Sequence, residues 1–538
     1  MELSRRLLPV VALVLVLAVV TGAFVLLYRQ PQEVRVVVYA YRDAITGIDP
    51  GAEDDVGVVV LHALYDTLLR YDPRTGEYVP WLAERFEKVA EDRWLIVIRK
   101  GAVFHDGSPV TAEDVRFSIE RALALYEEGI GLGFVWSCVK EVEVLNATHL
   151  EVVTDGPCDL RRVASAAYSA FVYSRRVLQL SGAANLTDRK LIEWFNSGNE
   201  LGSGPYRLRS YKPEREVVLE RFREWWGWKV VNNPRAPDVV VIRIVEDPGE
   251  QERGLRAGEI HIASSVPRAV LKSLREGGFE VRVADTYHNF ILMFNVLRWP
   301  TNVTEVRRAI ALAIPWDSVV SACLHGYGRV GSGLIPYGFP GYDPELRLGQ
   351  DLEEAARLLA EARVAGGTEL EIVITSGYDE EECFAQLLAG ELAKLGLRLR
   401  ITSLPWDLVK QRGTEVWSNP EAAPHMIIND WWPTYVTPYD YLSLLECGYV
   451  TWNWAGYCDE EFDERLWEAY EVDLADLEKA LPLYQELQRY IYEELPAINL
   501  WDMRHIYVYN PKKVLLPERA LNPLYTYVVF FEYVEVLS

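Results

Sequence analysis

The chain has 538 residues, of which 50% are hydrophobic and 25% are charged. These values exclude a disordered protein and predict two or three folded units. The formal net charge of -24 comes from 79 acidic against 55 basic residues, so neither nucleic acid nor an anionic lipid surface is the expected partner of the folded body. Aromatic residues make up 12% of the chain, which suits a large core and surfaces that stack on a ligand.

The N-terminal segment, residues 1–30, contains a long apolar stretch. The stretch runs from Leu7 to Tyr28, follows a pair of arginines, and is long enough to cross a hydrocarbon core of ~30 Å. A cleaved secretory signal peptide is the alternative, but the stretch exceeds a usual apolar region of roughly 7–15 residues, and no clear A-x-A site precedes Arg29. We favour an uncleaved membrane anchor. Either interpretation places everything after about residue 30 outside the cytoplasm.

The six cysteines fit an oxidising compartment, where disulfides form. Two pairs bracket short segments and are candidates for local disulfides: Cys138 with Cys158, and Cys447 with Cys458. The pairing of Cys323 and Cys383 stays open. The sequence contains no CxxC and no HExxH motif, so we expect no metal site and no cofactor.

The first predicted elements are a strand, a helix and a capped helix. Residues 33–39 have the pattern of a strand, and residues 56–72 have the periodicity of a helix. Thr111 is expected to cap a helix that runs from Ala112 to Tyr126, because its hydroxyl can accept a hydrogen bond from the backbone of Asp114 in the first turn.

Further along the chain, strands and helices alternate. Residues 202–227 predict a hairpin, and residues 239–264 predict a strand, a helix and a second strand, which indicates parallel pairing. A buried strand and two helices are expected over residues 290–326. The alternation over residues 351–404 is typical of a doubly wound layered structure, and helical periodicity returns over residues 462–495.

Taken together, these segments resemble the bacterial and archaeal family 5 extracellular solute-binding proteins, the class that contains the oligopeptide-, dipeptide- and nickel-binding components of ABC importers. The resemblance covers nearly the whole chain after about Glu33. Its clearest segments are YDTLLRYD with VPWLAERFE, RKGAVFHDGSPVTAEDVRFSIERA, GSGPYRLRSYKPEREVVLERFREWWG, RAGEIHIA and MFNVLRWPTNVTEVRRAIALAI. Most of these motifs have a structural explanation, so they identify the fold rather than the ligand.

The resemblance implies an α/β fold of the type II periplasmic-binding-protein class. In this fold two hinged lobes close over a solute, and an additional domain is inserted into the first lobe. The chain is expected to cross the hinge more than once. The expected boundaries are 1–30 for the N-terminal segment, 31–66, 200–285 and 499–538 for lobe I, 67–199 for the inserted domain, and 286–498 for lobe II.

The resemblance also implies where a solute is bound. In peptide-binding members, a tryptophan and a later aromatic segment ending in an aspartate line the cleft, and the aspartate pairs with the ammonium of the peptide. Trp406 matches the tryptophan, but Thr434 stands where the aspartate is expected. Thr434 cannot supply the charge that a desolvated ammonium requires. We therefore expect Asp430 to take this role, with Asp440 as the alternative; Asp430 could instead be a loop carboxylate that is hydrogen-bonded to the backbone.

The same departure favours a neutral solute, such as an oligosaccharide, as the alternative to a peptide. The sugar rings would pack on aromatic planes. The tryptophans available for this are Trp431, Trp432, Trp452 and Trp454. The last two stand two apart on a predicted strand, where packing in a core is their alternative role.

Four further residues are candidates for contact with the solute, and each has a structural alternative. Trp501 lies where the chain of the family returns across the hinge, but it could instead pack within a lobe. Tyr41 and Arg42 follow the first strand at the expected edge of the cleft, although an arginine there is often a surface residue. His288 lies beside a buried strand and could be a satisfied core histidine; a single histidine cannot hold nickel.

The mechanism implied by the resemblance is binding without chemistry. The solute bridges the lobes, stabilises the closed state, and the closed form docks on an ABC permease. We expect a monomer. Two alternatives have a different function: a membrane-anchored glycoside hydrolase that uses paired carboxylates, for which no catalytic motif is present, and a sensory receptor that passes the signal to another partner.

Overall fold

The computed structural model describes residues 34–537. The predicted membrane anchor in residues 1–30 lies outside these residues. Within residues 34–537, no helix is both long enough and apolar enough to cross a membrane.

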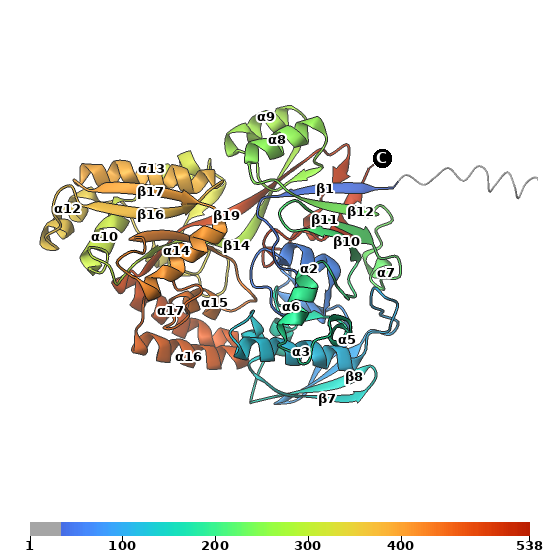
Figure 1. Ribbon diagram of the computed structural model, residues 1–538. Helices are drawn as coiled ribbons and strands as arrows, with labels where there is room; N and C mark the ends of the chain where they lie inside the picture. Colours follow the sequence, from blue (N-terminus) through green and yellow to red (C-terminus); the bar gives the residue numbers. More distant parts are fainter. Residues whose placement is uncertain (1–33, 538) are drawn as a thin grey trace, which may run out of the picture.

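A mixed sheet of eleven strands runs through both lobes (Figure 1). Its strands follow the order β10-β11-β12-β1-β13-β19-β14-β18-β16-β17, and β15 pairs with β19. The strands β1, β12 and β13 pair in parallel, as do β16, β17 and β18, which agrees with the strand–helix–strand units predicted from the sequence. The bounds in lobe I are β1 Val36–Tyr41, β10 Tyr206–Lys212, β11 Glu216–Arg221, β12 Val239–Ile244 and β13 Ile262–Ala263; those in lobe II are β15 Gly328–Val330, β16 Glu369–Thr375, β17 Arg398–Leu404 and β18 Met426–Trp431.

Two long strands, β14 (Glu280–Phe294) and β19 (Ala497–Tyr509), connect the lobes. They pair with each other along most of their length, and their register shifts between Asp285 and Asn289. Residues 501–503 of β19 pair with β15, and Val508 and Tyr509 pair with β13 in lobe I. The strand β19 thus runs from lobe II into lobe I.

Helices cover both faces of the sheet. In Figure 1, α8, α9 and α13 lie on one side of the sheet, and α2 and α14 lie on the other. The two helices α16 and α17 pack against each other beyond α14. The bounds are α2 Val58–Leu64, α8 Pro248–Ala257, α9 Leu271–Glu276, α10 Thr304–Ala313, α12 Leu352–Glu361, α13 Asp379–Lys394, α14 Trp406–Ser418, α15 Tyr439–Leu442, α16 Glu460–Ala475 and α17 Leu477–Glu494.

The inserted domain contains an antiparallel sheet in the order β5-β6-β8-β7, with α3 (Ala112–Glu127) beside it. The predicted helix start is confirmed, because the Asp114 carboxylate accepts a hydrogen bond from the backbone nitrogen of Thr111 at 3.0 Å. This bond satisfies one of the free donors at the helix terminus. The strands of this sheet are β5 Ala83–Ala90, β6 Arg93–Ile98, β7 Val139–Asn146 and β8 His149–Thr154.

The helix predicted over residues 56–72 is wrong in its second half. The helix α2 ends at Leu64, and the short strands β2 (Asp66–Thr67) and β3 (Leu69–Asp72) follow it. Asp66 is fully buried, and its carboxylate accepts hydrogen bonds from the indoles of Trp81, Trp225 and Trp226 at 2.9, 3.2 and 3.0 Å. Contacts with residues distant in sequence thus override the local helical pattern.

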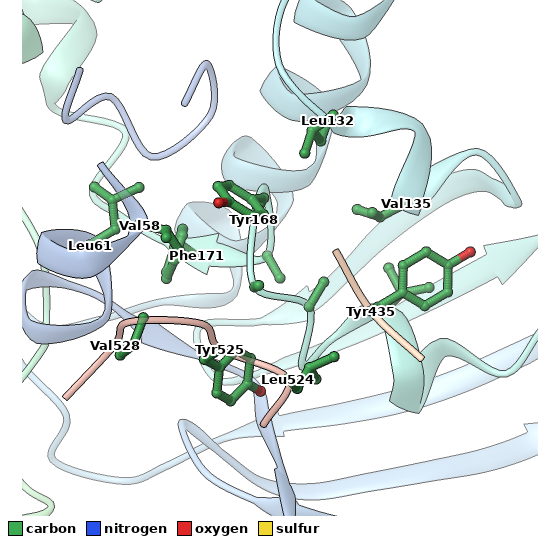
Figure 2. Packing of buried hydrophobic residues seen from close by; sticks show 14 of the residues in the cluster. Val58, Leu61, Leu132, Val135, Tyr168, Phe171, Tyr435, Leu524, Tyr525 and Val528 are labelled. Carbon is green, nitrogen blue, oxygen red and sulfur yellow. The ribbon is translucent and has the colours of Figure 1, made fainter. Parts of the chain in front are cut away.

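One continuous core joins parts of the chain that are far apart in sequence. Figure 2 shows side chains of α2, the inserted domain and the C-terminal tail packed together. They include Val58 and Leu61 from lobe I, Phe171 from the inserted domain, and Leu524 and Val528 from the tail. A second core lies within lobe II and contains residues of β14, α13 and β19. The inserted domain therefore shares its core with lobe I.

Disulfides pair all six cysteines. Cys138 bonds to Cys158 and Cys447 bonds to Cys458, as the spacing predicts. The third disulfide joins Cys323 to Cys383 and settles the pairing that the sequence leaves open. This last bond connects Cys323, at the end of the π-helical turn Val319–Cys323, to helix α13, and both cysteines line a cavity to which lobe I also contributes residues.

Candidate solute-binding site between the lobes

The two lobes meet through polar contacts to tryptophan side chains. Asp55, in the loop before α2, accepts hydrogen bonds from Trp406 Nε1 at 3.0 Å and from Lys410 Nζ at 2.7 Å. Tyr168, of the inserted domain, accepts a hydrogen bond from Trp432 Nε1 at 2.9 Å. The structure therefore brings Trp406 and Trp432, two of the predicted site residues, to the interface between the lobes.

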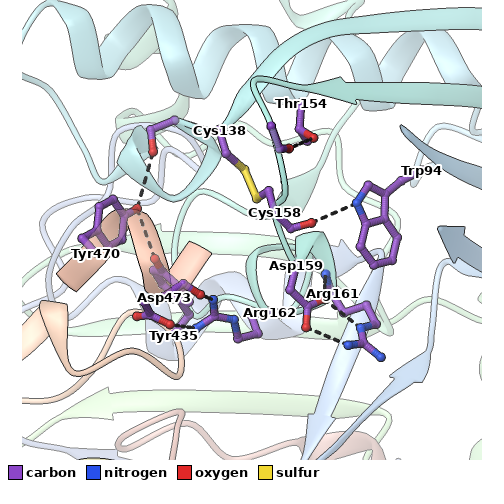
Figure 3. The surroundings of a disulfide bond; sticks show 12 residues. Trp94, Cys138, Thr154, Cys158, Asp159, Arg161, Arg162, Tyr435, Tyr470 and Asp473 are labelled. Carbon is purple, nitrogen blue, oxygen red and sulfur yellow. Dashed lines mark hydrogen bonds and ion pairs between the residues drawn. A yellow bond between two sulfur atoms is a disulfide. The ribbon is translucent and has the colours of Figure 1, made fainter. Parts of the chain in front are cut away.

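A buried ion pair joins the inserted domain to lobe II. Arg162 pairs with Asp473 of α16, and the two side chains are only 6% and 1% exposed (Figure 3). Thr437 and Tyr484 also donate hydrogen bonds to the carboxylate of Asp473. A buried charge is stable only when it is paired and fully hydrogen-bonded. Arg162 and Asp473 meet this condition only while the inserted domain and lobe II are in contact, so the ion pair depends on the closed arrangement of the lobes.

Four tryptophans form a cluster in lobe II at this interface. The ring of Trp452 lies 6.3 Å from that of Trp406 and 5.3 Å from that of Trp431, and Trp454 lies 5.7 Å from Trp406. The strand predicted for Trp452 and Trp454 is wrong, because both lie in the loop before α16. The indole nitrogen of Trp431 is buried without a hydrogen-bond partner among residues 34–537.

His288 and His505 connect the hinge strands to Asp430. His288 is fully buried; its Nε2 lies 3.0 Å from Asp430 Oδ2, and its Nδ1 lies 2.9 Å from His505 Nε2. A neutral His288 that donates to the carboxylate accepts at Nδ1, so His505 donates from Nε2. The hydroxyl of Tyr378 is 3.5 Å from the same carboxylate oxygen. Within the described chain, Oδ1 of Asp430 makes no hydrogen bond.

Carboxylates exceed cations at the centre of the interface. Asp55 and Asp430 both lie within electrostatic range of Asp43. Burial raises the pKa of Asp43, Arg42 opposes this rise, and the charges of Asp430 and Asp55 add to it. The neighbouring cations are Arg42, whose Nε is 3.5 Å from Asp43, and Lys410 on Asp55. The excess of negative charge suits a positively charged group of a solute.

Thr434 and Asp440 serve the loop that carries them. Thr434 is 1% exposed, its backbone nitrogen donates to the carboxylate of Asp440, and its carbonyl accepts from the backbone nitrogen of Ala167 at 2.7 Å. Burial raises the pKa of Asp440 to about 7. Thr434 thus joins lobe II to the inserted domain, and the carboxylate of Asp440 is already engaged.

An acidic cavity of about 350 Å³ lies between lobe I, the inserted domain and lobe II. Its carboxylates belong to Asp54, Asp440 and Glu446, and among the described residues that line it there is no lysine or arginine. Burial, together with the charge of Asp55, raises the pKa of Asp54 to about 6. The aromatic residues that line the cavity are Tyr126, Phe134, Tyr439, Tyr449 and Trp452.

The structure corrects the placement of Trp501. This side chain is fully buried in the core of lobe II, where its ring stacks on Phe290 at 5.1 Å and meets Phe384 at 5.6 Å. It therefore packs within the lobe and does not face the cleft. Tyr41, by contrast, lies at the end of β1 with its ring 5.5 Å from Tyr527, and its buried hydroxyl has no partner among residues 34–537.

Several interface residues are absent from the sequence-based prediction. Asp43 directly follows Tyr41 and Arg42, so its position after the first strand could have indicated a residue at the edge of the cleft. Asp55 and Tyr168 lie in irregular segments with no motif, and Lys410 is one of many charges on a helix. Their roles depend on the approach of the opposite lobe, which sequence periodicity does not report.

Residues 77–451 match the family described as bacterial extracellular solute-binding proteins, family 5 middle region. The chain belongs to this family. The dipeptide-binding protein of Escherichia coli is 23% identical over 497 residues, which cover 86% of this chain and 87% of that relative. Di/tripeptide-binding protein 2 of Pseudomonas aeruginosa is 26% identical over 469 residues, which cover 82% and 84%.

Solved structures share the fold. The periplasmic binding protein DppA of Helicobacter pylori, in complex with the peptide STSA, has a TM-score of 0.79 at 21% identity and covers 94% of this chain and 99% of its own. The murein tripeptide binding protein MppA of Escherichia coli has a TM-score of 0.79 at 18% identity and covers 94% and 99%. The two-lobed α/β fold expected from the sequence is confirmed. The family membership makes this protein an extracytoplasmic receptor of an ABC importer, and not an enzyme.

Proposed function

We propose that this receptor captures peptides with a free amino terminus between its lobes and delivers them to an ABC permease. The observation that carries the proposal is the excess of carboxylates at the centre of the interface. Three carboxylates lie there, those of Asp43, Asp55 and Asp430. The arginine and lysine side chains that pair with them within residues 34–537 are Arg42, on Asp43, and Lys410, on Asp55. The peptide-binding names of the relatives support the same solute class.

The ammonium of the peptide is placed between Asp43 and Asp430. Asp43 belongs to lobe I and Asp430 to β18 of lobe II, so a cation between them bridges the lobes. An ammonium that leaves water needs ionised partners, and Oδ1 of Asp430 makes no hydrogen bond within residues 34–537. Because the two carboxylates meet only when the lobes are closed, the solute stabilises the closed state by its differential affinity.

Two buried donors at the interface can serve the backbone of a peptide. The hydroxyl of Tyr41 and the indole nitrogen of Trp431 have no partner among the described residues. Carbonyl oxygens of an extended peptide are suitable acceptors for both. An oligosaccharide offers hydroxyls for these donors but no charge to offset the carboxylates, and the peptide-binding relatives do not favour it.

Calorimetry on the full-length chain in nanodiscs tests the proposal. Short peptides with free amino termini are expected to bind, and the same peptides with acetylated amino termini are expected to bind at least about tenfold more weakly, because one charged hydrogen bond is worth at least that factor. A panel of oligosaccharides is the control. Binding of oligosaccharides without binding of any peptide would overturn the proposal.

We further infer that residues 1–30 hold the receptor at the outer face of the membrane as an uncleaved helix, and that the receptor acts as a monomer. The apolar run from Leu7 to Tyr28 supports the tether. Tethering raises the effective concentration of the receptor near its permease. N-terminal sequencing of the mature protein from the membrane fraction is expected to begin at Met1, or at Glu2 after removal of the initiator; a start near residue 30 in the soluble fraction would contradict the inference.

A further inference from the structure

The strands that connect the lobes carry two buried histidines that reach Asp430. His288 lies on β14 and His505 on β19. Nε2 of His505 lies 2.9 Å from Nδ1 of His288, whose Nε2 lies 3.0 Å from Oδ2 of Asp430. These three residues are called here the histidine chain. It crosses β19, β14 and β18, which are neighbouring strands of the large sheet (Figure 1).

An irregularity in β14 directs His288 toward β18. The register between β14 and β19 shifts over residues 285–289, so His288 has no partner in the ladder of β19. The hydroxyl of Thr286 accepts a hydrogen bond from the backbone nitrogen of His288 at 3.2 Å and donates one to the carbonyl of Met503 at 2.7 Å. Irregularities of this kind change the direction of a side chain where they occur. The local backbone therefore places this imidazole against Asp430.

Aromatic rings hold both imidazoles in place. The ring of Tyr527 stacks on His505 with the centroids 4.0 Å apart. His288 lies between Phe290, at 4.9 Å, and Trp432, which meets it edge-on at 5.3 Å. Because a packed interior leaves no room for a ring to turn, the ring nitrogens stay directed along the histidine chain.

The donors and acceptors of the histidine chain determine where its protons lie. A carboxylate only accepts, so Nε2 of His288 carries a proton. A second proton on Nδ1 of His288 would force His505 to accept at Nε2 and to bury an N–H at Nδ1, where it has no acceptor within residues 34–537. We therefore assign a neutral His288, which accepts at Nδ1 from Nε2 of His505. Burial, with the charges of Arg268 and Arg42, holds the pKa of His505 well below its usual value, so His505 is neutral as well.

A neutral His288 leaves the negative charge of Asp430 without a compensating cation. No lysine or arginine forms an ion pair with Asp430 within residues 34–537. Arg42 stacks on the ring of Tyr378 and pairs with Asp43 instead. The hydrogen bond from His288 stabilises the charged carboxylate and occupies Oδ2, so Oδ1 remains available to a cation from outside the chain.

We propose that His288 and His505 position Asp430 as the anionic partner of the ammonium of a bound peptide, an inference that rests on the proposed function. His288 binds Oδ2 and leaves Oδ1 for the solute. His505 keeps His288 neutral, because its hydrogen bond occupies the atom at which a second proton would bind. Neither histidine contacts the solute in this arrangement, so both are positioning residues.

Nuclear magnetic resonance of the histidine side chains tests the assigned protons without any peptide. The full-length chain is prepared with isotope-labelled histidine, and the signals of His288 and His505 are assigned by their loss in His288→Gln and His505→Gln. Both rings are expected to be neutral at neutral pH, with the proton on Nε2. A doubly protonated His288 under these conditions would overturn the proposal.

Calorimetry with free and N-terminally acetylated peptides tests the effect on binding. The acetylation effect is the ratio of the two dissociation constants, and His288→Leu and His505→Leu are each expected to reduce it about threefold, because Asp430 loses its orientation or its uncompensated charge. A general structural defect would weaken both peptides alike and leave the ratio unchanged. His288→Gln and His505→Gln keep an N–H donor and are expected to preserve the acetylation effect.

His62→Leu is the matched control. His62 is a buried histidine of α2 that packs against the rings of Phe171 and Tyr525 and lies outside the histidine chain. This variant is expected to lower the stability and to leave the acetylation effect unchanged. Circular dichroism checks that each variant is folded, and the spectra of the wild type decide where a leucine variant is not.

A full acetylation effect in both leucine variants would overturn the positioning roles and leave the proposed function intact. Peptides that bind the wild type without any acetylation effect would overturn both the ammonium site and the positioning roles. If no peptide binds the wild type, the proposed function fails and the spectra decide alone. A neutral His288 with its proton on Nε2 then supports the positioning of a charged Asp430, and a doubly protonated His288 overturns it.

Discussion

Two cavities are built from residues of both lobes, but the charges that line them differ. The acidic cavity contains three carboxylates and, among its described lining residues, no lysine or arginine. A second cavity, of about 250 Å³, is lined by Arg42, Arg268 and Arg504 and also by Asp379 and Glu380, so its described lining carries both signs of charge. Strand β19 contributes residues 503–506 to this second cavity.

This difference shows that closure of the lobes does not impose one kind of charge on the whole interface. Closure desolvates both cavities, and buried charges are stable only with partners of opposite sign. The lining of the second cavity supplies such partners itself, whereas the described lining of the acidic cavity supplies no lysine or arginine. A positively charged group is therefore favoured in the acidic cavity more than in the second one.

The first prediction separates core from interface among the tryptophans of lobe II. Trp501→Ala is expected to lower the free energy of unfolding by about 4 kcal/mol, because it empties a fully buried site between Phe290 and Phe384. Trp406→Ala removes a half-buried ring at the interface, so it should cost less stability and weaken peptide binding. Urea unfolding and calorimetry measure the two effects. Equal losses of stability would place Trp406 in the core as well.

The second prediction concerns how the tryptophan side of the interface is held closed. Arg162→Met is expected to destabilise the protein by about 3 kcal/mol, since Asp473 would remain buried without its cation. Arg161→Met is the matched control: its side chain is 52% exposed on Asp159, so the expected loss is below about 1 kcal/mol. Urea unfolding of both variants gives the comparison. A similar loss in the two variants would show that the buried pair adds no more than the exposed one.

The third prediction uses pH to sharpen the acidic side of the comparison. Burial raises the pKa of Asp440 to about 7 in the folded protein, above its unfolded value. Between these values the folded state holds a proton that the unfolded state has released, so Asp440 makes stability fall as pH rises from about 4 to about 7, with a slope on the order of 1 kcal/mol per pH unit. Asp440→Asn should remove this share of the slope in thermal or urea unfolding, while other buried carboxyls with a raised pKa, such as Asp54, keep the rest.

Asp459→Asn is the control for the pH prediction, because the pKa of Asp459 is lowered by hydrogen bonds to its carboxylate despite the opposing effect of its partial burial. Its contribution to stability is fully present above the unfolded pKa and constant between pH 5 and 8. The variant should therefore differ from the wild type by a constant amount in this window. A slope that is unchanged in Asp440→Asn would assign the titration to other groups.

The fourth prediction concerns the carboxylates at the centre of the interface. Asp43→Asn is expected to weaken the binding of free peptides about tenfold and to remove the effect of N-terminal acetylation, because one proposed partner of the ammonium loses its charge. Glu421→Gln, at an exposed position, is the control and should change neither. Calorimetry with free and acetylated peptides measures both. An undiminished effect of acetylation in Asp43→Asn would exclude Asp43 as a partner of the ammonium.

Local patterns predicted much of the secondary structure. The helix from Ala112 agrees with the structure to within one residue at its end, because capping and periodicity are properties of neighbouring residues. The strand after residue 33 and the alternation over residues 351–404 agree for the same reason. The prediction fails at residues 66–72, where the burial of Asp66 among three indoles decides the backbone.

The candidate site was harder to predict than the fold. Trp406 and Trp432 reach the interface as the resemblance implies, but Thr434 and Trp501 serve the loop and the core. Asp43 and Asp55 gain their importance from residues of the opposite lobe, more than three hundred positions away in sequence. A motif can identify such residues in the sequence only when the chain shares it with its relatives. Here the loop departs from the family pattern, because Thr434 stands where an aspartate is expected.

The sequence by itself pointed to the family through the resemblance of its motifs. It also determined the order of strands and helices and an acidic, oxidised, aromatic-rich protein, because these depend on composition and on local periodicity. Only the tertiary structure decided which charges face each other across the hinge. It placed His288 between His505 and Asp430, left Nε of Arg42 and Nη1 of Arg268 without a hydrogen bond within residues 34–537, and moved Trp501 into the core. The physical reason is that burial and pairing of charge are set by the approach of segments far apart in the chain.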